Sequence, residues 1–246
     1  MELDLFSTPF DNTAVDFLET LDVPVYKVAS FENVDLPLLK KISSTKKPII
    51  LSTGMATLAE IDEAISTIRE TGNNEIALLK CTSAYPALPS SMNLKTIPHL
   101  SEAFNLPVGL SDHTLGISTA IAAVALGACI IEKHLTLSRK FLPGPDSKFS
   151  LEPNEFRDMV QAVRVAEAAI GRIAYGINED EKASLVFRRS LFVVQDIKEG
   201  ERFTNLNIRS IRPGYGLHTR YLNEVLGRAA AKDIERGTPV AWNLIR

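Results

Sequence analysis

Cysteine, histidine and tryptophan are scarce in this chain of 246 residues, which holds 2 Cys, 4 His and 1 Trp. Cys81 and Cys129 cannot build a disulfide framework, and each lies in an apolar run that predicts a buried strand. The N-terminus lacks the pattern of a secretory signal, and no window approaches the ~18 apolar residues of a membrane span. We therefore expect a cytoplasmic protein in a reducing compartment, with no membrane contact.

An excess of either charge is also lacking, because 27 Lys and Arg stand against 30 Asp and Glu. The net charge of -3 argues against a dedicated nucleic-acid binder. The hydrophobic content of 45% suffices for an ordinary core. A Gly-rich phosphate loop, a Gly-x-Ser-x-Gly elbow and a Cys-x-x-Cys pair are all missing, so nucleotide-dependent transfer, serine hydrolysis and dithiol redox chemistry have no support.

Short apolar runs alternate with amphipathic stretches as far as about residue 170, which is the rhythm of repeated βα units. Helices are expected at 57–71 and 117–126. Six strands are expected, at 4–7, 24–29, 48–52, 76–80, 107–110 and 128–133. Polar residues follow most of these strands directly, and in a parallel α/β barrel the chemistry sits where the strands end. The sequence therefore predicts an α/β fold of the TIM-barrel type with one shared pocket.

The texture of the chain changes after a last amphipathic helix at 152–170. We expect a barrel domain at 1–170, a glycine-punctuated linker at 171–184 and a small β-rich domain at 185–246. The last segment holds 11 Lys and Arg against 6 Asp and Glu, so it is basic while the larger part is acidic. This asymmetry indicates either a simple drift in composition or a basic module that helps to cover a site for an anionic ligand.

His113 and His134 each end a predicted strand, on two consecutive units. Because neighbouring strands lie ~4.8 Å apart, the two imidazoles could bind one divalent metal, although a lone histidine at a strand end is more often structural. Glu132 shares the face of His134, and Asp146 could supply an oxygen ligand or simply belong to a rigid turn at 143–146. With oxygen donors nearby, an open site for a catalytic metal such as Mn²⁺ is favoured over a structural zinc site.

Lys27 closes its strand, and hydroxyl side chains follow on later units. One compact positive charge with several hydroxyl donors is typical of a phosphate or carboxylate site. The alternative is that these Ser and Thr residues merely cap the following helices. Glu32 could orient a sugar hydroxyl, transfer a proton or act as a cap. A barrel aldolase that uses Lys27 as a Schiff-base nucleophile is a further reading.

Six motifs, in this order and spacing, resemble the sialic acid synthase family: Ser7-Thr8-Pro9-Phe10, Tyr26-Lys27-Val28-Ala29-Ser30-Phe31-Glu32, Ile50-Leu51-Ser52-Thr53-Gly54-Met55, Cys81-Thr82-Ser83-Ala84-Tyr85-Pro86, Gly109-Leu110-Ser111-Asp112-His113-Thr114 and Glu132-Lys133-His134. The tail from about Ser190, with Ile211-Arg212-Pro213-Gly214, is similar to that family's antifreeze-like (SAF, β-clip) domain. The resemblance covers nearly the whole chain.

The resemblance implies condensation of phosphoenolpyruvate with an N-acetylated amino sugar, with Mn²⁺ or Mg²⁺ as cofactor. By position it implies that His113 and His134 bind the metal, and that Glu32 and Asp146 are catalytic. Substrate-binding roles are implied for Thr8, Lys27, Ser30, Ser52, Ser83, Tyr85, Ser111 and Arg212. It also implies a homodimer in which the SAF domain of one subunit closes over the barrel of the other and offers Arg212 to the acyl group of the sugar.

Within the family, the segment around Lys27 to Leu38, and Ser83 in place of an asparagine, look most like the pseudaminic acid synthase branch. N-acetylneuraminate or legionaminate synthesis is the alternative. Full-length members begin two βα units earlier, so we expect a barrel that lacks its first two units and is active only in an extended form. A sugar-binding remnant without catalytic activity is the hypothesis from a different class.

Overall fold

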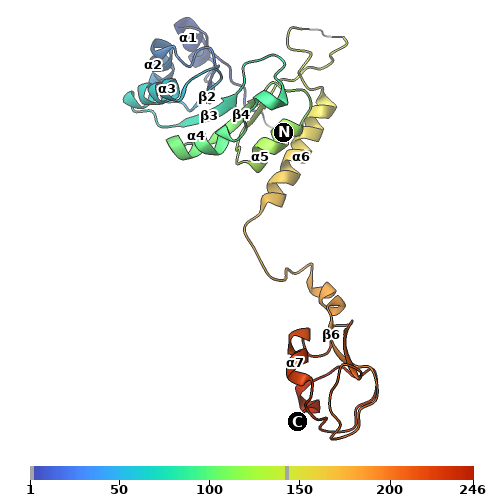
Figure 1. The fold of residues 1–246 in the computed structure, drawn as a ribbon. Coiled ribbons are helices and arrows are strands. Elements are labelled where there is room, and N and C mark those ends of the chain that lie inside the picture. The colour runs from blue at the N-terminus through green and yellow to red at the C-terminus, as the bar shows by residue number, and fades with distance from the viewer. Residues whose placement is uncertain (1–2, 142–143) are drawn as a thin grey trace. The chain divides into compact units, whose positions relative to one another are not determined.

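The computed structural model describes residues 3–141 and 144–246, and the chain divides into two units, Met1–Arg172 and Ile173–Arg246. The first unit is built on a parallel sheet in the order β1-β2-β3-β4-β5 (Figure 1). Its strands are β1 (Tyr26–Val28), β2 (Ile49–Ser52), β3 (Ile76–Cys81), β4 (Val108–Asp112) and β5 (Ile131–Lys133). Because sequential strands pair in parallel, all of them end at the same edge of the sheet.

Helices connect these strands and pack beside one another, as α1 does against α2, α2 against α3 and α5 against α6. They are α1 (Asn12–Thr20), α2 (Leu36–Ser44), α3 (Leu58–Glu70), α4 (Thr96–Phe104), α5 (Ser118–Ala125) and α6 (Pro153–Ile170), with a 3₁₀ turn at Pro89–Ser91. Side chains cap several of them at the start. Asp11 accepts from Ala14 N at 2.8 Å, and Thr57 forms a reciprocal capping box with Glu60. These caps set where the strand-to-helix loops end.

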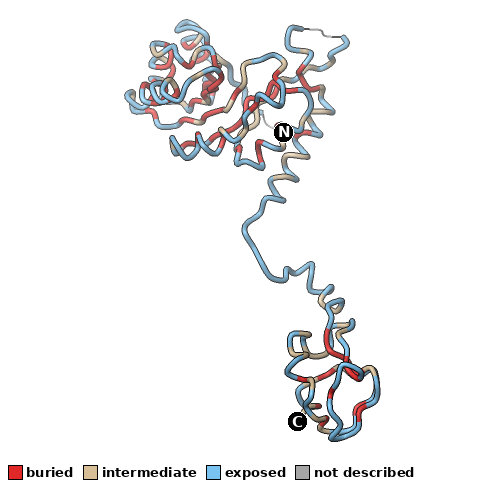
Figure 2. The backbone as a smooth tube through the Cα atoms, viewed as in Figure 1, coloured by how far each residue is buried: buried red, intermediate tan, exposed pale blue. Residues whose placement is uncertain are grey.

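The first core lies between the sheet and helices α1 to α5, and its largest buried side chains include Tyr26, Leu39, Ile65 and Leu78. Every residue of β1 and β4 is buried, as expected for strands covered on both faces (Figure 2). A smaller cluster of Ala120, Leu151 and Met159 joins α5 to α6. Residues 170–184 are exposed throughout.

The sheet is strongly curved. β1 and β5 are its outermost strands, and in a flat sheet they would lie about 19 Å apart, four strand spacings. Lys27 Nζ on β1 nevertheless comes within 3.7 Å of Glu132 Oε2 on β5. The sheet therefore curves so that the carboxyl ends of its two outermost strands face each other, as in part of a barrel.

The second unit has its own core, formed by residues such as Leu191, Phe203, Val225 and Val240. Its two strands, β6 (Ser190–Val193) and β7 (Ile208–Ile211), are antiparallel. The remaining elements are α7 (Leu222–Val225) and 3₁₀ turns at Lys182–Phe187, Thr219–Tyr221 and Trp242–Leu244. None of the helices in the described part of the chain combines the length and apolar character that a bilayer crossing needs.

Two expectations from the sequence were wrong. Residues 4–7 form no strand, because the segment makes one backbone hydrogen bond to the sheet, from Lys27 N to Ser7 O, while Leu5 stays exposed. Cys129 is exposed and lies ahead of β5, which begins only at Ile131. Apolarity alone predicted a strand in both places, but a strand also needs a hydrogen-bonded ladder.

Candidate active site at the carboxyl edge of the sheet

A pocket of about 400 Å³ opens where the five strands end. Nine of the twelve residues predicted to be catalytic, substrate-binding or metal-binding line it, namely Thr8, Lys27, Ser30, Ser52, Tyr85, Ser111, His113, His134 and Asp146. Phe10, Ala29, Phe31, Cys81 and Glu132 complete the lining. The structure thus brings together side chains from all five strands and their following loops.

Alternation along β4 and β5 decides which side chains face the pocket. Ser111 and His113 line it, whereas Asp112 between them does not; Glu132 and His134 line it, whereas Lys133 does not. Successive side chains of a strand point to opposite faces, so this division follows from the backbone. The pairing of Ser111 with Glu132 in the sheet places the two motifs at equal height.

Lys27 is the buried cation of the pocket. Its Nζ donates to Ser52 Oγ at 2.7 Å and to the Val28 carbonyl at 2.9 Å, and Glu132 lies across the pocket at 3.7 Å. Burial lowers the pKa of Lys27 below its ordinary value, and the charge of Glu132 opposes that shift. Ser111 Oγ in turn donates to Glu132 Oε1 at 2.5 Å. A row of polar side chains, Ser52, Lys27, Glu132 and Ser111, therefore crosses the pocket.

Gly54 lets the loop after β2 approach this row closely. Its amide donates to Ser30 Oγ at 3.0 Å. A Cβ on Gly54 would lie 2.3 Å from Ser83 Oγ and 2.7 Å from Ser30 Oγ. Ser83 does not line the pocket itself; its hydroxyl lies 3.8 Å from Cys81 Sγ, behind the lining.

His113 and His134 lie side by side, with ring centroids 5.3 Å apart. Phe149, which is 2% exposed, packs edge-on against both rings, and Tyr85 covers His113 at 4.4 Å. His113 Nδ1 lies 3.1 Å from the Thr82 carbonyl oxygen. His134 Nδ1 lies 3.4 Å from Asp146 Oδ2. Phe149, which the sequence did not single out, is thus the platform for the histidine pair.

Cys81 is a second group that the sequence did not assign to the site. Its Sγ lies 3.8 Å from His113 Nδ1. Burial would raise the pKa of the thiol, but the contacts with His113, Ser30 and Ser83 together lower it to about 7. Burial lowers the pKa of His113, and Cys81 and the Thr82 carbonyl outweigh it, so the net shift is upward. The pKa of His134 is lowered by burial and by the charge of His113.

The donor set fits a divalent metal. The Thr82 carbonyl oxygen, within hydrogen-bond distance of His113 Nδ1, requires that nitrogen to carry the proton. The Asp146 carboxylate 3.4 Å from His134 Nδ1 favours the same tautomer there, so Nε2 of each ring is the ligand atom. Neither Nε2 has a hydrogen-bond partner among the described residues. Within that same part of the chain, no three His, Cys, Asp or Glu side chains are grouped to hold a metal alone. Substrate or water oxygens would have to complete the coordination shell, as in an open catalytic site.

Three of the predicted site residues, Glu32, Ser83 and Arg212, do not line the pocket. Glu32 Oε2 is buried without a hydrogen-bond partner among the described residues, and burial raises the pKa of this carboxyl. Arg212 is exposed on the second unit. Pro143, in the predicted turn at 143–146, lies outside the described residues, whereas Asp146 is described and lines the pocket.

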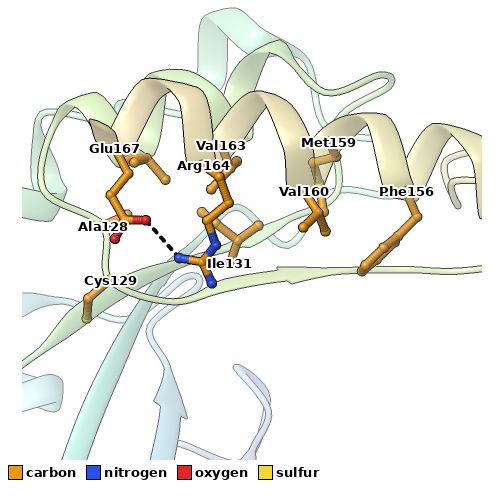
Figure 3. A pocket seen from close by; sticks show the side chains of 10 residues that line it. Ala128, Cys129, Ile131, Phe156, Met159, Val160, Val163, Arg164 and Glu167 are labelled. Carbon is orange, nitrogen blue, oxygen red and sulfur yellow. Dashed lines mark hydrogen bonds and ion pairs between the residues drawn. The ribbon is translucent and has the colours of Figure 1, made fainter. Parts of the chain in front are cut away.

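A second hollow of about 280 Å³ lies between α6 and the segment that leads into β5. Figure 3 shows Phe156, Met159, Val160 and Val163 of α6 above Ile131, with the Arg164–Glu167 ion pair at one end. Its lining is mainly apolar, and its two charged side chains are already paired with each other. This hollow therefore offers no unpaired charge to a polar substrate.

A curved parallel sheet with its polar groups gathered where the strands end defines an α/β enzyme with a site of the barrel type. Residues 1–175 match the NeuB family and residues 188–246 match the SAF domain. The chain belongs to the NeuB family, and the resemblance found in its motifs is confirmed.

Characterised relatives agree with this assignment. The pseudaminic acid synthase of Helicobacter pylori is 46% identical over 243 residues, which are 98% of this chain and 71% of that protein. The N,N'-diacetyllegionaminic acid synthase of Campylobacter jejuni is 44% identical over an alignment that spans 92% of this chain and 69% of that protein. The crystal structure of the spore coat polysaccharide biosynthesis protein SpsE of Bacillus subtilis superposes with a TM-score of 0.65 at 36% identity, over 99% of this chain and 74% of that one.

Proposed function

We propose that this enzyme condenses phosphoenolpyruvate with the open-chain aldehyde of an N-acetylated amino sugar. C3 of the enol bonds to the aldehyde carbon, whose oxygen takes up a proton and becomes a hydroxyl group. Water adds to C2, and phosphate leaves as the C2 ketone forms. The products are a nine-carbon α-keto acid and phosphate. The observation that carries this proposal is that a buried lysine, its hydroxyl neighbours and a histidine pair share one pocket.

Lys27 is the anchor for the phosphoenolpyruvate anion. Its burial leaves the ammonium poorly hydrated, so an incoming phosphate or carboxylate replaces little water. The hydroxyls of Ser52 and Ser111 are hydrogen-bonded to Lys27 and Glu132, respectively, and can form neutral hydrogen bonds to the phosphoenolpyruvate anion. Ser30 and Thr8 line the same pocket. This set supplies one positive charge and several donors, the combination that a phosphate ester requires.

The opposite wall suits the sugar. Tyr85 is half exposed beside His113, and Asp146 is 3.4 Å from His134, so both reach the mouth of the pocket. Glu32 lies outside the lining on the Lys27 side, next to Phe31, and burial raises the pKa of its carboxyl, so we assign it a proton that reaches the substrate through water and not by direct contact. Ser83 supports this wall from behind through Cys81.

His113 and His134 would hold Mn²⁺ or Mg²⁺ through their Nε2 atoms. When bound, such a metal polarises the aldehyde carbonyl toward attack. The residues of the chain keep both rings in the tautomer that can bind a metal, through the Thr82 carbonyl and Asp146. Phe149 and Tyr85 exclude water from the faces of the rings.

The acceptor that we infer is a diacetamido-trideoxy hexose, which makes the product pseudaminic acid. Identities of 46% or 47% to three pseudaminic acid synthases support this branch, against 44% to a legionaminate enzyme. We further infer that the curved sheet is part of an eight-stranded TIM-type barrel with two further βα units, and that the enzyme works in the cytoplasm as a homodimer. In that dimer the basic SAF domain of one subunit would close over the acidic unit of the other, with Arg212 toward the sugar.

Phosphate release from phosphoenolpyruvate tests this proposal directly. It is measured with a panel of amino sugars, with and without chelator, on this chain and on a chain lengthened at its N-terminus. We expect turnover with the diacetamido sugar in the longer chain and its loss with EDTA. Turnover that resists the chelator would refute the metal assignment, and borohydride trapping of a carbonyl substrate on Lys27 would refute the condensation in favour of Schiff-base chemistry.

A further inference from the structure

A buried ion pair lies directly behind the two histidines. Asp112 ends β4 and Lys133 ends β5, and the two residues are register partners in the sheet. Lys133 Nζ donates to Asp112 Oδ2 at 2.9 Å, and both side chains have no exposed surface. Neither lines the pocket, because the alternation of the strands turns them toward α5.

Thr114 ties this pair to the backbone around His113. Asp112 Oδ1 accepts from Thr114 N at 2.9 Å and from Thr114 Oγ1 at 2.8 Å, and Lys133 Nζ also donates to the Thr114 carbonyl. Thr114 Oγ1 lies 3.0 Å from Thr119 Oγ1 on α5. His113 is thereby held through both of its chain neighbours, Asp112 and Thr114. The Lys133 ammonium that contacts them belongs to the residue directly before His134.

Stability alone does not account for such a pair. Removing two charges from water costs about as much as their attraction returns, and apolar residues of similar volume often fit such a place equally well. The pair does, however, specify geometry. It fixes the height of β4 against β5 and the path of the chain through His113, on which the spacing of the two rings depends.

We propose that Asp112, Lys133 and Thr114 form a clamp that positions the His113 and His134 rings. The clamp holds His113 Nδ1 against the Thr82 carbonyl, so that Nε2 of each ring is presented to the pocket. These three are positioning residues that act through the histidines without touching a substrate. This inference rests on the histidine pair of the proposed function, and it extends that function to residues outside the pocket.

The test replaces the pair by apolar side chains of similar size, in the double variant Asp112→Leu/Lys133→Met. Single changes are avoided because each would leave an unpaired buried charge. The double variant removes both buried charges together but leaves Thr114 N without its acceptor, so we expect a lower unfolding temperature than that of the parent. Both readouts are therefore taken at a temperature where parent and variant are fully folded, which separates stability from positioning. As a control, Asp16→Leu/Lys41→Met removes an ion pair between α1 and α2, neither member of which lines the pocket.

Two readouts follow. In metal-free protein, ¹⁵N shifts of the ring nitrogens report the tautomer at a pH where both rings are neutral. We expect His113 in the Nδ1–H form in the parent and the control, and a mixture of tautomers in the double variant. In the second readout, Mn²⁺ titrated by electron paramagnetic resonance should bind roughly 10- to 100-fold more weakly to the double variant, the range seen when partners of metal-binding histidines are lost.

Thr114→Val is the second variant, because it removes one of the three donors to Asp112 and keeps the ion pair. It should shift both readouts in the same direction as the double variant. Unchanged tautomer and affinity in the folded double variant, or in Thr114→Val if the double variant does not fold, would overturn the clamp. If the parent itself fails to bind Mn²⁺, the metal part of the proposed function falls, while the tautomer of His113 still decides the clamp.

Discussion

Replacing Lys27 by methionine should separate substrate binding from stability. The ammonium donates to Ser52 Oγ and to a carbonyl oxygen, and it faces Glu132 at 3.7 Å. Losing a hydrogen bond from a charged donor to bound phosphoenolpyruvate costs about 1.5–3 kcal/mol, which corresponds to roughly 10- to 150-fold weaker binding. Stability should change by less than about 1 kcal/mol, because release of a buried charge offsets the hydrogen bond lost by Ser52.

The assay is titration of phosphoenolpyruvate by calorimetry, with urea unfolding in parallel. Lys80→Met is the matched control, because burial also lowers the pKa of Lys80, which lies on β3 but does not line the pocket. Equal loss of affinity in both variants would show that the effect is not local to the pocket. Unchanged affinity in Lys27→Met would refute the role of this lysine as the anion anchor.

Further outcomes can be measured on the same protein. Gly109→Ala should cost about 2–3 kcal/mol in urea unfolding, because its Cβ would lie 2.3 Å from a backbone carbonyl; full stability would contradict that packing. The pKa of Glu32 is raised, so its contribution to stability is complete below pH 4.5 and is lost as pH rises through the folded-state pKa. Glu32→Gln should therefore gain stability relative to the parent above pH 4.5, and equal pH profiles would exclude this. His113→Gln and His134→Gln should each weaken Mn²⁺ binding at least about 10-fold, whereas the exposed His99→Gln should not.

Much of the pocket could be predicted from the sequence because its residues sit at the ends of strands. Lys27, Ser52, Ser111 and His113 each follow an apolar run, and parallel strands bring such ends to one edge whatever the helices between them do. The helix expected at 57–71 is α3, with Thr57 as its capping residue. The regular spacing of its apolar residues and a strong cap made that element predictable.

Contacts that join distant parts of the chain could not be predicted. Phe149 lies in a loop without periodic pattern, and nothing local places it beneath two histidines. Cys81 was noted for its scarcity, yet its contact with His113 depends on the β3–β4 pairing. The Asp112–Lys133 pair did carry a signal, since each charge ends a strand directly before a histidine. Because side chains alternate along a strand, Asp112 and Lys133 could have been predicted to face away from the pocket that His113 and His134 line.

The two units have separate cores, one led by the parallel sheet and one by Leu191, Phe203 and Val240. A junction placed in the exposed segment at 170–184, here called the seam, divides neither core. Exchange of the C-terminal module between related genes is thus a single crossover that leaves both cores uncut. Chimeras joined at that seam would let the lineage replace the C-terminal module while every residue that lines the pocket of the first unit stays unchanged.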